Sequence, residues 1–210
     1  IIQVGLIPVY VDVCRDTLNM DPIQAEAAVS EKTRILMPVH TLGYPAPMNE
    51  LMQIAEKNNL KVLEDCCEAH GSRVGDRKVG SFGQIASFSF FVAHNMTTGE
   101  GGMIVTGDDQ LDDICRSLRE FGRCSQKDLS KGRYYSDNVL KDYDKRYVFS
   151  QIGYNLRMTD VTGSFGLAQL EKLNTMNERR HENADWLQSA LQEQCKDTFE
   201  FQGENENYFH

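Results

Sequence analysis

The chain has 210 residues and a formal net charge of −9, with 40% hydrophobic and 25% charged residues, which is typical of a soluble globular protein. The acidic balance argues against nucleic acid as the main partner, and no apolar run approaches the roughly 18 residues of a membrane span. The opening residues 1–8 lack the basic and small-residue pattern of a signal peptide, so we expect neither secretion nor a membrane partner.

Short apolar segments alternate with amphipathic ones in the first 120 residues. Strands are predicted over Ile7–Val13, Arg34–Val39, Lys61–Asp65, Gln84–Phe91 and Gly102–Thr106. Helices are predicted over Asp21–Val29, Met48–Asn58 and Asp108–Glu120, the first with Asp21 as N-cap and Pro22 at its first position. This alternation predicts an α/β fold, with a mainly parallel sheet flanked by helices.

The second half of the chain does not continue this alternation of strands and helices. Residues 122–150 are polar and Tyr-rich, which predicts a long surface excursion. A long helix is predicted from Thr159 to Cys195, with a break near Lys172–Thr175. Its mixed-charge run Asn177–Asp185 is expected to form an exposed helix face, and the polar tail 202–210 is expected to fray.

The six cysteines indicate the redox surroundings of the protein. Their spacing is irregular, and Cys66 and Cys67 are adjacent, which disfavours a simple disulfide between them. We therefore expect a reduced, cytoplasmic protein, with these two cysteines serving as small buried fillers.

An acidic pair marks the first candidate site. Glu64 and Asp65 end a buried strand, and α/β proteins place ligands at the carboxyl edge of the sheet. The alternative is a solvated loop start in which Asp65 caps a helix. A second segment favours the site: the glycine-bearing turn Val79–Gly83 leads into Ser87–His94. His40, after an earlier strand, is a further candidate for lining the same site.

Four segments resemble one family in the right order: Pro38–Gly43, Glu64–Gly71, Ser87–Gly102 and Gly153–Asp160. This is the DegT/DnrJ/EryC1/StrS family, the sugar-aminotransferase branch of the fold type I enzymes that use pyridoxal 5′-phosphate (PLP). Because family members are considerably longer, we expect a fragment that lacks the N-terminal part and the C-terminal small domain. Residues 1–160 would form part of the PLP-binding large domain, and residues 161–210 the connecting helix toward the small domain.

The resemblance implies a role for each matching residue. Asp65 would pair with the protonated pyridine nitrogen of PLP, which keeps the ring an electron sink. Glu68 would reach the ring hydroxyl, and Ser89 would bind the phosphate. Asn155 would reach the phosphate of a neighbouring subunit, so the resemblance implies a homodimer with a shared active site.

His94 stands where the family normally has the lysine that holds PLP as a Schiff base. A histidine moves protons but forms no such stable imine. This replacement, together with Ala93, Glu68 and Thr41–Gly43, resembles the NDP-4-keto-6-deoxyhexose 3-dehydratases of deoxysugar biosynthesis, of the colitose and ascarylose type. In that branch pyridoxamine 5′-phosphate (PMP) condenses with the 4-keto group, and His94 would take a proton from the cofactor while the 3-hydroxyl leaves. Histidine suits this role because an unperturbed imidazole exchanges protons near neutral pH.

The dehydratase branch also raises the question of an iron–sulfur cluster. The ascarylose-type enzyme binds [2Fe–2S] through one cysteine shortly after the aspartate and a Cys-x-Cys after a Gly-Arg. Cys67 matches the first ligand, but Cys124 after Arg123 is followed by no second cysteine in register. We therefore expect no cluster and no metal, and a route in which L-glutamate regenerates PMP and a nucleotide-sugar is the substrate.

A second class of function is open at this point. A sugar aminotransferase-like protein that has lost its Schiff-base lysine could be a non-catalytic paralogue, which keeps the fold for binding a sugar or cofactor. The other matching residues, Asp65, Glu68 and Ser89, favour the enzyme.

Overall fold

The computed structural model describes residues 1–124, 143–195, 198–199 and 201. The chain divides into two compact units: Ile1–Val105 together with Val161–His210 (the first unit), and Thr106–Asp160 (the second unit). Residues 125–142 of the predicted surface excursion and the whole predicted tail 202–210 lie outside the described residues. The division into a large domain over residues 1–160 and a connecting helix over 161–210 stays a prediction.

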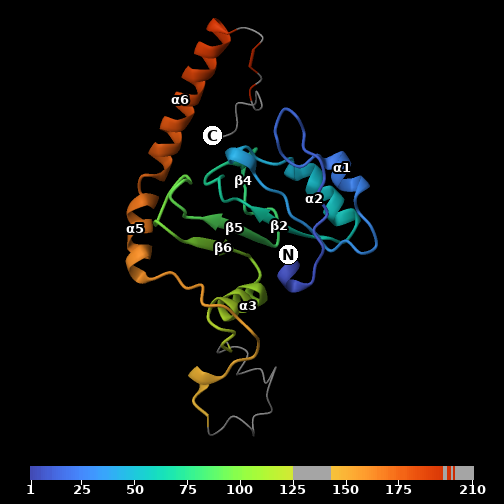
Figure 1. The fold of residues 1–210 in the computed structure, drawn as a ribbon, viewed down its shortest axis with the longest axis vertical. Helices are drawn as coiled ribbons and strands as arrows, with labels where there is room; N and C mark the ends of the chain where they lie inside the picture. The colour runs from blue at the N-terminus through green and yellow to red at the C-terminus, as the bar shows by residue number, and fades with distance from the viewer. Residues whose placement is uncertain (125–142, 196–197, 200, 202–210) are drawn as a thin grey trace. The chain divides into compact units, whose positions relative to one another are not determined.

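Four strands form one sheet in the first unit, in the order β1-β2-β5-β6 (Figure 1). They are β1 (Ile35–Leu36), β2 (Lys61–Asp65), β5 (Ile85–Ser89) and β6 (Gly102–Val105). β1, β2 and β5 run parallel to one another, and β6 runs antiparallel to β5. Two further strands, β3 (Arg73–Val74) and β4 (Arg77–Lys78), form an antiparallel hairpin. The predicted α/β fold with a mainly parallel sheet is confirmed.

Local sequence signals account for where the helices of this unit begin and end. The helices and 3-10 turns are η1 (Ile2–Val4), α1 (Pro22–Ala27), η2 (Thr41–Gly43), α2 (Met48–Lys57), α5 (Asp160–Leu170) and α6 (Leu173–Gln194). The Asp21 side chain caps α1 as predicted, accepting a hydrogen bond from the Ile23 N–H at 2.8 Å. α2 ends at Asn58, and the predicted break near Lys172 separates α5 from α6.

The main core of the first unit lies where α2 packs against β1 and β2, with α1 packed on α2 (Figure 1). Met48 and Leu51, three residues apart on one face of α2, are fully buried. They pack with Leu36 of β1 and Val62 of β2. Each such side chain contributes about 1.5–3 kcal/mol by leaving water, so this core fixes the two strands whose ends carry the site.

The strand predicted over Ile7–Val13 is wrong. Among the described residues this segment forms only one isolated bridge, between Val13 and Met20. Ile7 and Tyr10 are 86% and 90% exposed, and Pro8 has no N–H to donate to a ladder. Apolar alternation alone makes no strand where no neighbouring backbone pairs with it.

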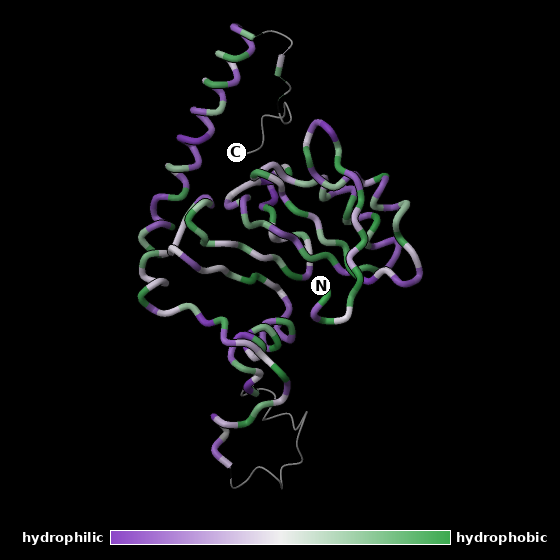
Figure 2. Tube along the Cα trace, viewed as in Figure 1, coloured by the Kyte–Doolittle hydropathy of each residue, from purple (hydrophilic) through white to green (hydrophobic). Residues whose placement is uncertain are grey.

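α6 is mostly polar, as the mixed-charge run predicts. Figure 2 shows hydrophilic residues along much of this helix. Asn177, the first residue of the predicted exposed face, is the exception, because it is only 4% exposed. Within the described part of the chain, no helix is both long and apolar enough to cross a membrane.

The second unit contains α3 (Asp109–Arg119) and the 3-10 turn η3 (Lys145–Tyr147). Asp108 caps α3 by accepting hydrogen bonds from the N–H groups of the second and third helical residues at 2.7 and 3.0 Å. Gly122 follows the helix with a φ of 82°, and a Cβ there would collide with the Gln151 carbonyl. This turn therefore requires glycine.

Candidate functional site

The carboxyl ends of three neighbouring strands carry the predicted site segments to one edge of the sheet. Asp65 is the last residue of β2 and pairs in register with Ser87 of β5, so Ser89 lies further along the same edge. His40 follows β1, and its N–H donates to the Asp65 carbonyl at 3.0 Å. Parallel α/β sheets bind ligands at this edge. The structure therefore brings Asp65, Ser89 and the segments after them to a common location.

The Asp65 carboxylate is half-buried, and its hydrogen-bond donor in the described structure is a backbone N–H. Its Oδ1 accepts a hydrogen bond from the Cys67 N–H at 3.1 Å. Burial and the bond to Asp65 raise the pKa of the Cys67 thiol to about 11, so this thiol stays protonated at neutral pH. Among the described residues, no Lys, Arg or His side chain forms an ion pair with Asp65. Such a carboxylate suits a ligand atom that carries positive charge.

Glu64 is fully buried, so the interpretation of Glu64 and Asp65 as an acidic pair at the sheet edge is wrong for Glu64. Its two oxygens accept three backbone N–H groups at 2.7 Å each, from Gly80, Phe82 and Gly83. The His40 ring lies 3.3 Å from Oε2. Burial by itself raises the pKa of the Glu64 carboxyl, but the bonds from His40 and the backbone outweigh it and lower that pKa overall. Glu64 is therefore an ionised internal acceptor.

His40 faces Glu64 rather than the edge of the sheet, which corrects the expectation that it lines the site. The side chain is 0% exposed. Its Nδ1 accepts the Ala46 N–H at 3.0 Å, so the ring proton is on Nε2, which donates to Glu64. His40 thus ties the end of β1 to β2 twice, through its own N–H to Asp65 and through its ring to Glu64. We call Glu64, His40 and the turn 80–83 the Glu64 brace.

Two side chains of the brace and the neighbouring Cys66 lie close enough together to bind one metal ion. Donor atoms of His40, Glu64 and Cys66 lie within 4.8 Å of one another, and all three residues are buried. Both His40 nitrogens and both Glu64 oxygens are already engaged in hydrogen bonds. Burial also raises the pKa of the Cys66 thiol, which opposes the thiolate that a metal requires. The cluster is better explained as a structural support beneath Asp65.

Glu68 holds the loop after β1. Its Oε2 accepts the Leu42 N–H at 2.8 Å, and Leu42 has a φ of 56°, a left-handed conformation unusual for leucine. Asn19 fixes the same loop, accepting the Thr41 N–H at 2.9 Å and donating to the Tyr44 carbonyl at 2.9 Å. Asn19 is 0% exposed, yet no sequence pattern points to this role. The loop and Glu68, two features of the dehydratase resemblance, are therefore in direct contact.

Ser89 and His94 lie at the two ends of a turn after β5. The Ser89 hydroxyl oxygen accepts the Phe91 N–H at 3.2 Å, and the His94 N–H donates to the Phe91 carbonyl at 3.1 Å. The His94 ring packs edge-on to the Phe91 ring, with centroids 6.1 Å apart. Both Ser89 and His94 are half-buried, so each is accessible to a small molecule at this edge.

His70 is a packed residue that supports the loop bearing His94. Its Nδ1 lies 3.2 Å from the Asn95 side-chain oxygen, and its ring contacts Phe88 and Phe90 at 5.3 and 5.9 Å between centroids. The ring is 5% exposed, and its Nε2 has no partner among the described residues. Burial, with smaller contributions from His94 and Arg180, lowers the pKa of His70, while the Asn95 bond partly opposes this shift.

The lowered pKa of His70 predicts a loss of stability in mild acid. Below the ordinary histidine pKa of 6.5, the unfolded chain takes up a proton that folded His70 does not, so stability falls as the pH falls from that value. The slope from this group is at most about 1.4 kcal/mol per pH unit. His70→Asn, which keeps a donor toward Asn95, should flatten the dependence of unfolding free energy on pH between about 5 and 6.5. Denaturant titrations of both proteins at several pH values measure the free energy of unfolding. Equal slopes of this free energy against pH would contradict the assignment of the pH dependence to His70.

Asn155 belongs to the second unit. It forms an isolated antiparallel bridge with Glu120, and its side chain is exposed. The Tyr154 carbonyl accepts the Phe121 N–H at 2.8 Å, which fixes the backbone next to it. Its implied contact with a neighbouring subunit stays a prediction.

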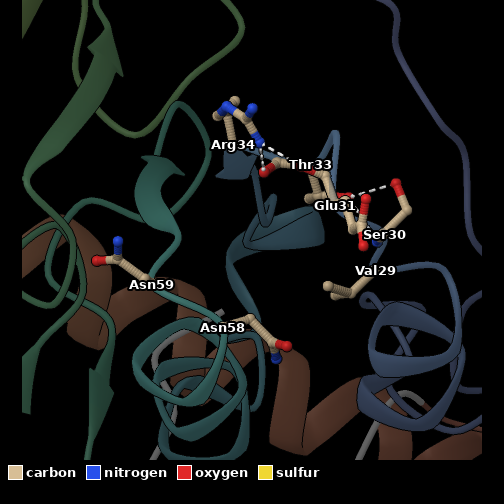
Figure 3. A pocket seen from close by; sticks show the side chains of 7 residues that line it. All are labelled: Val29, Ser30, Glu31, Thr33, Arg34, Asn58 and Asn59. Carbon is tan, nitrogen blue, oxygen red and sulfur yellow. Dashed lines mark hydrogen bonds between the residues drawn. The ribbon is translucent and has the colours of Figure 1, made fainter.

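A pocket of about 560 Å³ lies away from these residues (Figure 3). It is lined by Val29, Ser30, Glu31, Thr33, Arg34, Asn58 and Asn59. These residues precede β1 and β2, whereas Asp65 ends β2, so the pocket is at the opposite edge of the sheet. Arg34 points its guanidinium at the carbonyls of Glu31 and Thr33, at 2.7 and 2.8 Å. The pocket is therefore not the predicted site.

Several known proteins, among them the following two, match most of this chain. The lipopolysaccharide biosynthesis protein RfbH of Salmonella typhimurium is 41% identical over 198 residues, covering 91% of this chain and 45% of that protein. The dTDP-4-dehydro-2,6-dideoxy-D-glucose 3-dehydratase of Saccharopolyspora spinosa is 39% identical over 197 residues, covering 90% and 43%. The chain spans less than half the length of these relatives.

Solved structures of both aminotransferases and 3-dehydratases share the fold. An aminotransferase from Psychrobacter cryohalolentis superposes with a TM-score of 0.81 at 32% identity, over 91% of this chain and 47% of that one. The Escherichia coli GDP-4-keto-6-deoxy-D-mannose-3-dehydratase with bound hydrated PLP gives 0.75 at 29% identity, over 88% and 47%. Aminotransferases and 3-dehydratases thus both resemble this chain.

The family assignment rests on the whole chain rather than on one motif. The sequence model of the DegT/DnrJ/EryC1/StrS aminotransferase family matches residues 1–210. The sheet order and the solved structures agree with part of the large domain of a fold type I PLP-dependent enzyme. The chain belongs to the DegT/DnrJ/EryC1/StrS aminotransferase family.

Proposed function

We propose that the complete protein removes the 3-hydroxyl from a nucleotide-linked 4-keto-6-deoxyhexose, with PMP and PLP as forms of its cofactor and His94 as acid and base. The observation that carries the proposal is His94 itself, half-buried in the turn after β5, at the position that the resemblance assigns to the family's lysine. The relatives named as 3-dehydratases support this proposal, and the aminotransferase relatives are equally similar, so the choice of reaction rests on His94.

The side chains at the sheet edge fit such a cofactor. Asp65 offers a half-buried carboxylate without a cationic partner among the described residues, which suits a protonated ring nitrogen. The Ser89 hydroxyl accepts the Phe91 N–H and keeps its own proton for a phosphate oxygen. Glu68, held by Leu42, would reach the ring hydroxyl, and Asn155 would serve the partner subunit of a homodimer.

His94 would do the proton transfer. PMP supplies an amine for the keto group and a ring that takes up electrons. A ring nitrogen of His94 accepts a proton and later returns it, and its edge-on packing against Phe91 limits the directions in which the imidazole can point. Overall, the C3–OH bond becomes C3–H while L-glutamate becomes 2-oxoglutarate and ammonia. Glutamate is thus the reductant, and the proposal needs no [2Fe–2S] cluster.

The complete protein, supplied with PLP, L-glutamate and a panel of 4-keto-6-deoxyhexose nucleotides, tests the proposal. We expect at least one substrate to give a product lighter by one oxygen atom, with equimolar 2-oxoglutarate and ammonia. Mass spectrometry and proton NMR at C3 detect this change. Asp65→Asn, which keeps the shape but removes the charge, should abolish turnover.

Two results would argue against it. Formation of a 4-amino sugar that retains its 3-hydroxyl would identify an aminotransferase. Reversible PLP binding without any conversion of glutamate would identify a non-catalytic paralogue, the reading that the missing lysine otherwise favours.

A further inference from the structure

α6 makes contact with the turn that bears His94, although the two are more than 80 residues apart in sequence. The Arg180 Nη2 donates to the Asn95 carbonyl at 3.2 Å. Asn95 directly follows His94, and its side-chain oxygen lies 3.2 Å from the His70 Nδ1. The residue after His94 is therefore held at two points, by its main chain and by its side chain.

Asn177, one turn earlier on α6, also takes part in these contacts. Its Nδ2 donates to the His70 carbonyl at 2.7 Å, and its Oδ1 accepts from the Arg180 Nη1 at 3.2 Å. Asn177 is 4% exposed on a helix that is otherwise mostly polar. A Cβ at Gly71 would lie 3.0 Å from the Asn177 amide, so glycine permits this close approach. The amide thus orients the guanidinium while it holds the segment after β2.

The turn itself is closed at its base, so its tip is the part that needs support. The Phe90 carbonyl accepts both the Thr98 N–H at 2.9 Å and the Thr97 hydroxyl at 3.0 Å. Between these closing bonds, the contacts of His94 in the described part of the chain are its N–H bond to Phe91 and the packing of its ring. Arg180 and His70, both from outside the turn, attach to Asn95, the residue next to His94.

We propose that Asn177 and Arg180 are positioning residues, which fix the direction of the side chain at position 94 toward the cofactor. This inference rests on the proposed function, because it requires residue 94 to face the cofactor. α6 thereby contributes to the site through hydrogen bonds to Asn95 and His70 rather than through contact with the reacting atoms. Misplacing a reacting group by about 1 Å can cost on the order of a hundredfold in rate, so an effect of this kind is measurable.

His94→Lys provides the probe, because a lysine at that position should capture PLP covalently if it faces the cofactor. Borohydride reduction and mass spectrometry of the complete protein give the rate of capture. Adding Arg180→Met to His94→Lys removes the guanidinium and keeps the stem, and we expect capture to slow by about tenfold or more. The affinity for PMP, measured by equilibrium dialysis, should stay near that of the unmodified protein because Asp65 and Ser89 are unchanged. Arg180→Lys should restore part of the rate.

The matched control is Arg179→Met on the same helix, since Arg179 is 74% exposed and pairs only with Glu182 in the described structure. It should leave the rate of capture unchanged. Equal capture rates with and without Arg180→Met would overturn the inference, as would a parallel loss of PMP affinity and melting temperature. Asn177→Ala gives a second test of the same prediction. No capture by His94→Lys alone would instead contradict the proposed function, and this inference with it.

Discussion

His94→Asn is expected to lower the rate of 3-deoxygenation by about 10²- to 10⁴-fold, the usual contribution of a positioned acid–base group. Asparagine is similar in size and still forms hydrogen bonds, but it cannot accept and return a proton at neutral pH. Because His94 is half-buried and its N–H bond to the Phe91 carbonyl involves only main chain, the turn should keep its shape. The loss should therefore appear in kcat, with PMP affinity little changed.

Stopped reactions of the complete protein, analysed by mass spectrometry, measure this effect. His181→Asn is the control, because His181 lies on α6 beside Asp185 and has no place in the site. It should leave kcat unchanged. If His94→Asn retains a rate close to that of the unmodified protein, His94 is not the base.

Glu64→Gln is expected to lower the free energy of unfolding by about 3 kcal/mol, through buried donors left without an acceptor. A glutamine places an NH₂ group where one carboxylate oxygen was. An NH₂ group at the Oε2 position faces the donors of both His40 and Gly80, at a residue that is 0% exposed. An NH₂ group at the Oε1 position faces the N–H groups of both Phe82 and Gly83. His40 cannot compensate by moving its ring proton, because its Nδ1 already accepts the Ala46 N–H. Three kcal/mol corresponds to a fall in melting temperature of about 6–12 °C for a domain of this size.

Thermal and denaturant unfolding of the unmodified protein and of Glu64→Gln measure this loss in the free energy of unfolding. Glu68→Gln is a matched control, because half-buried Glu68 accepts one hydrogen bond among the described residues, from the Leu42 N–H, and an amide oxygen also accepts it. Its change should stay below about 1 kcal/mol. The Glu64 carboxyl has a lowered pKa, so its contribution is present above the ordinary value of 4.5 and is lost as the pH falls below it. A Glu64→Gln protein as stable as the unmodified one would show that the brace is dispensable.

The elements predicted well from the sequence are those with a local cause. Asp21 and Asp108 cap helices whose first turns offer free N–H groups, and the break near Lys172 separates two helices. The strand predicted over Ile7–Val13 failed because a strand needs a partner, and apolar alternation carries no information about one.

The site was predictable where a motif marks it and not where distant residues support it. Alternation along Lys61–Asp65 puts Glu64 on the same face as buried Val62, a signal that Glu64 is internal. Its partners in the turn 80–83 lie 16–19 residues away and could not be assigned by spacing. The bond from Asn177 to the His70 carbonyl spans 107 residues, and the mixed-charge run around Asn177 pointed to exposure.

A single turnover shows whether His94 moves the proton when the 3-hydroxyl is lost. The complete protein is loaded with PMP, freed of glutamate, and mixed with a 4-keto-6-deoxyhexose nucleotide that it accepts. We expect up to one equivalent per site of a product without the 3-hydroxyl, together with PLP and ammonia, and we expect His94→Asn to form this product about 10²- to 10⁴-fold more slowly. A 4-amino sugar that keeps its 3-hydroxyl, formed equally well by both proteins, would contradict it.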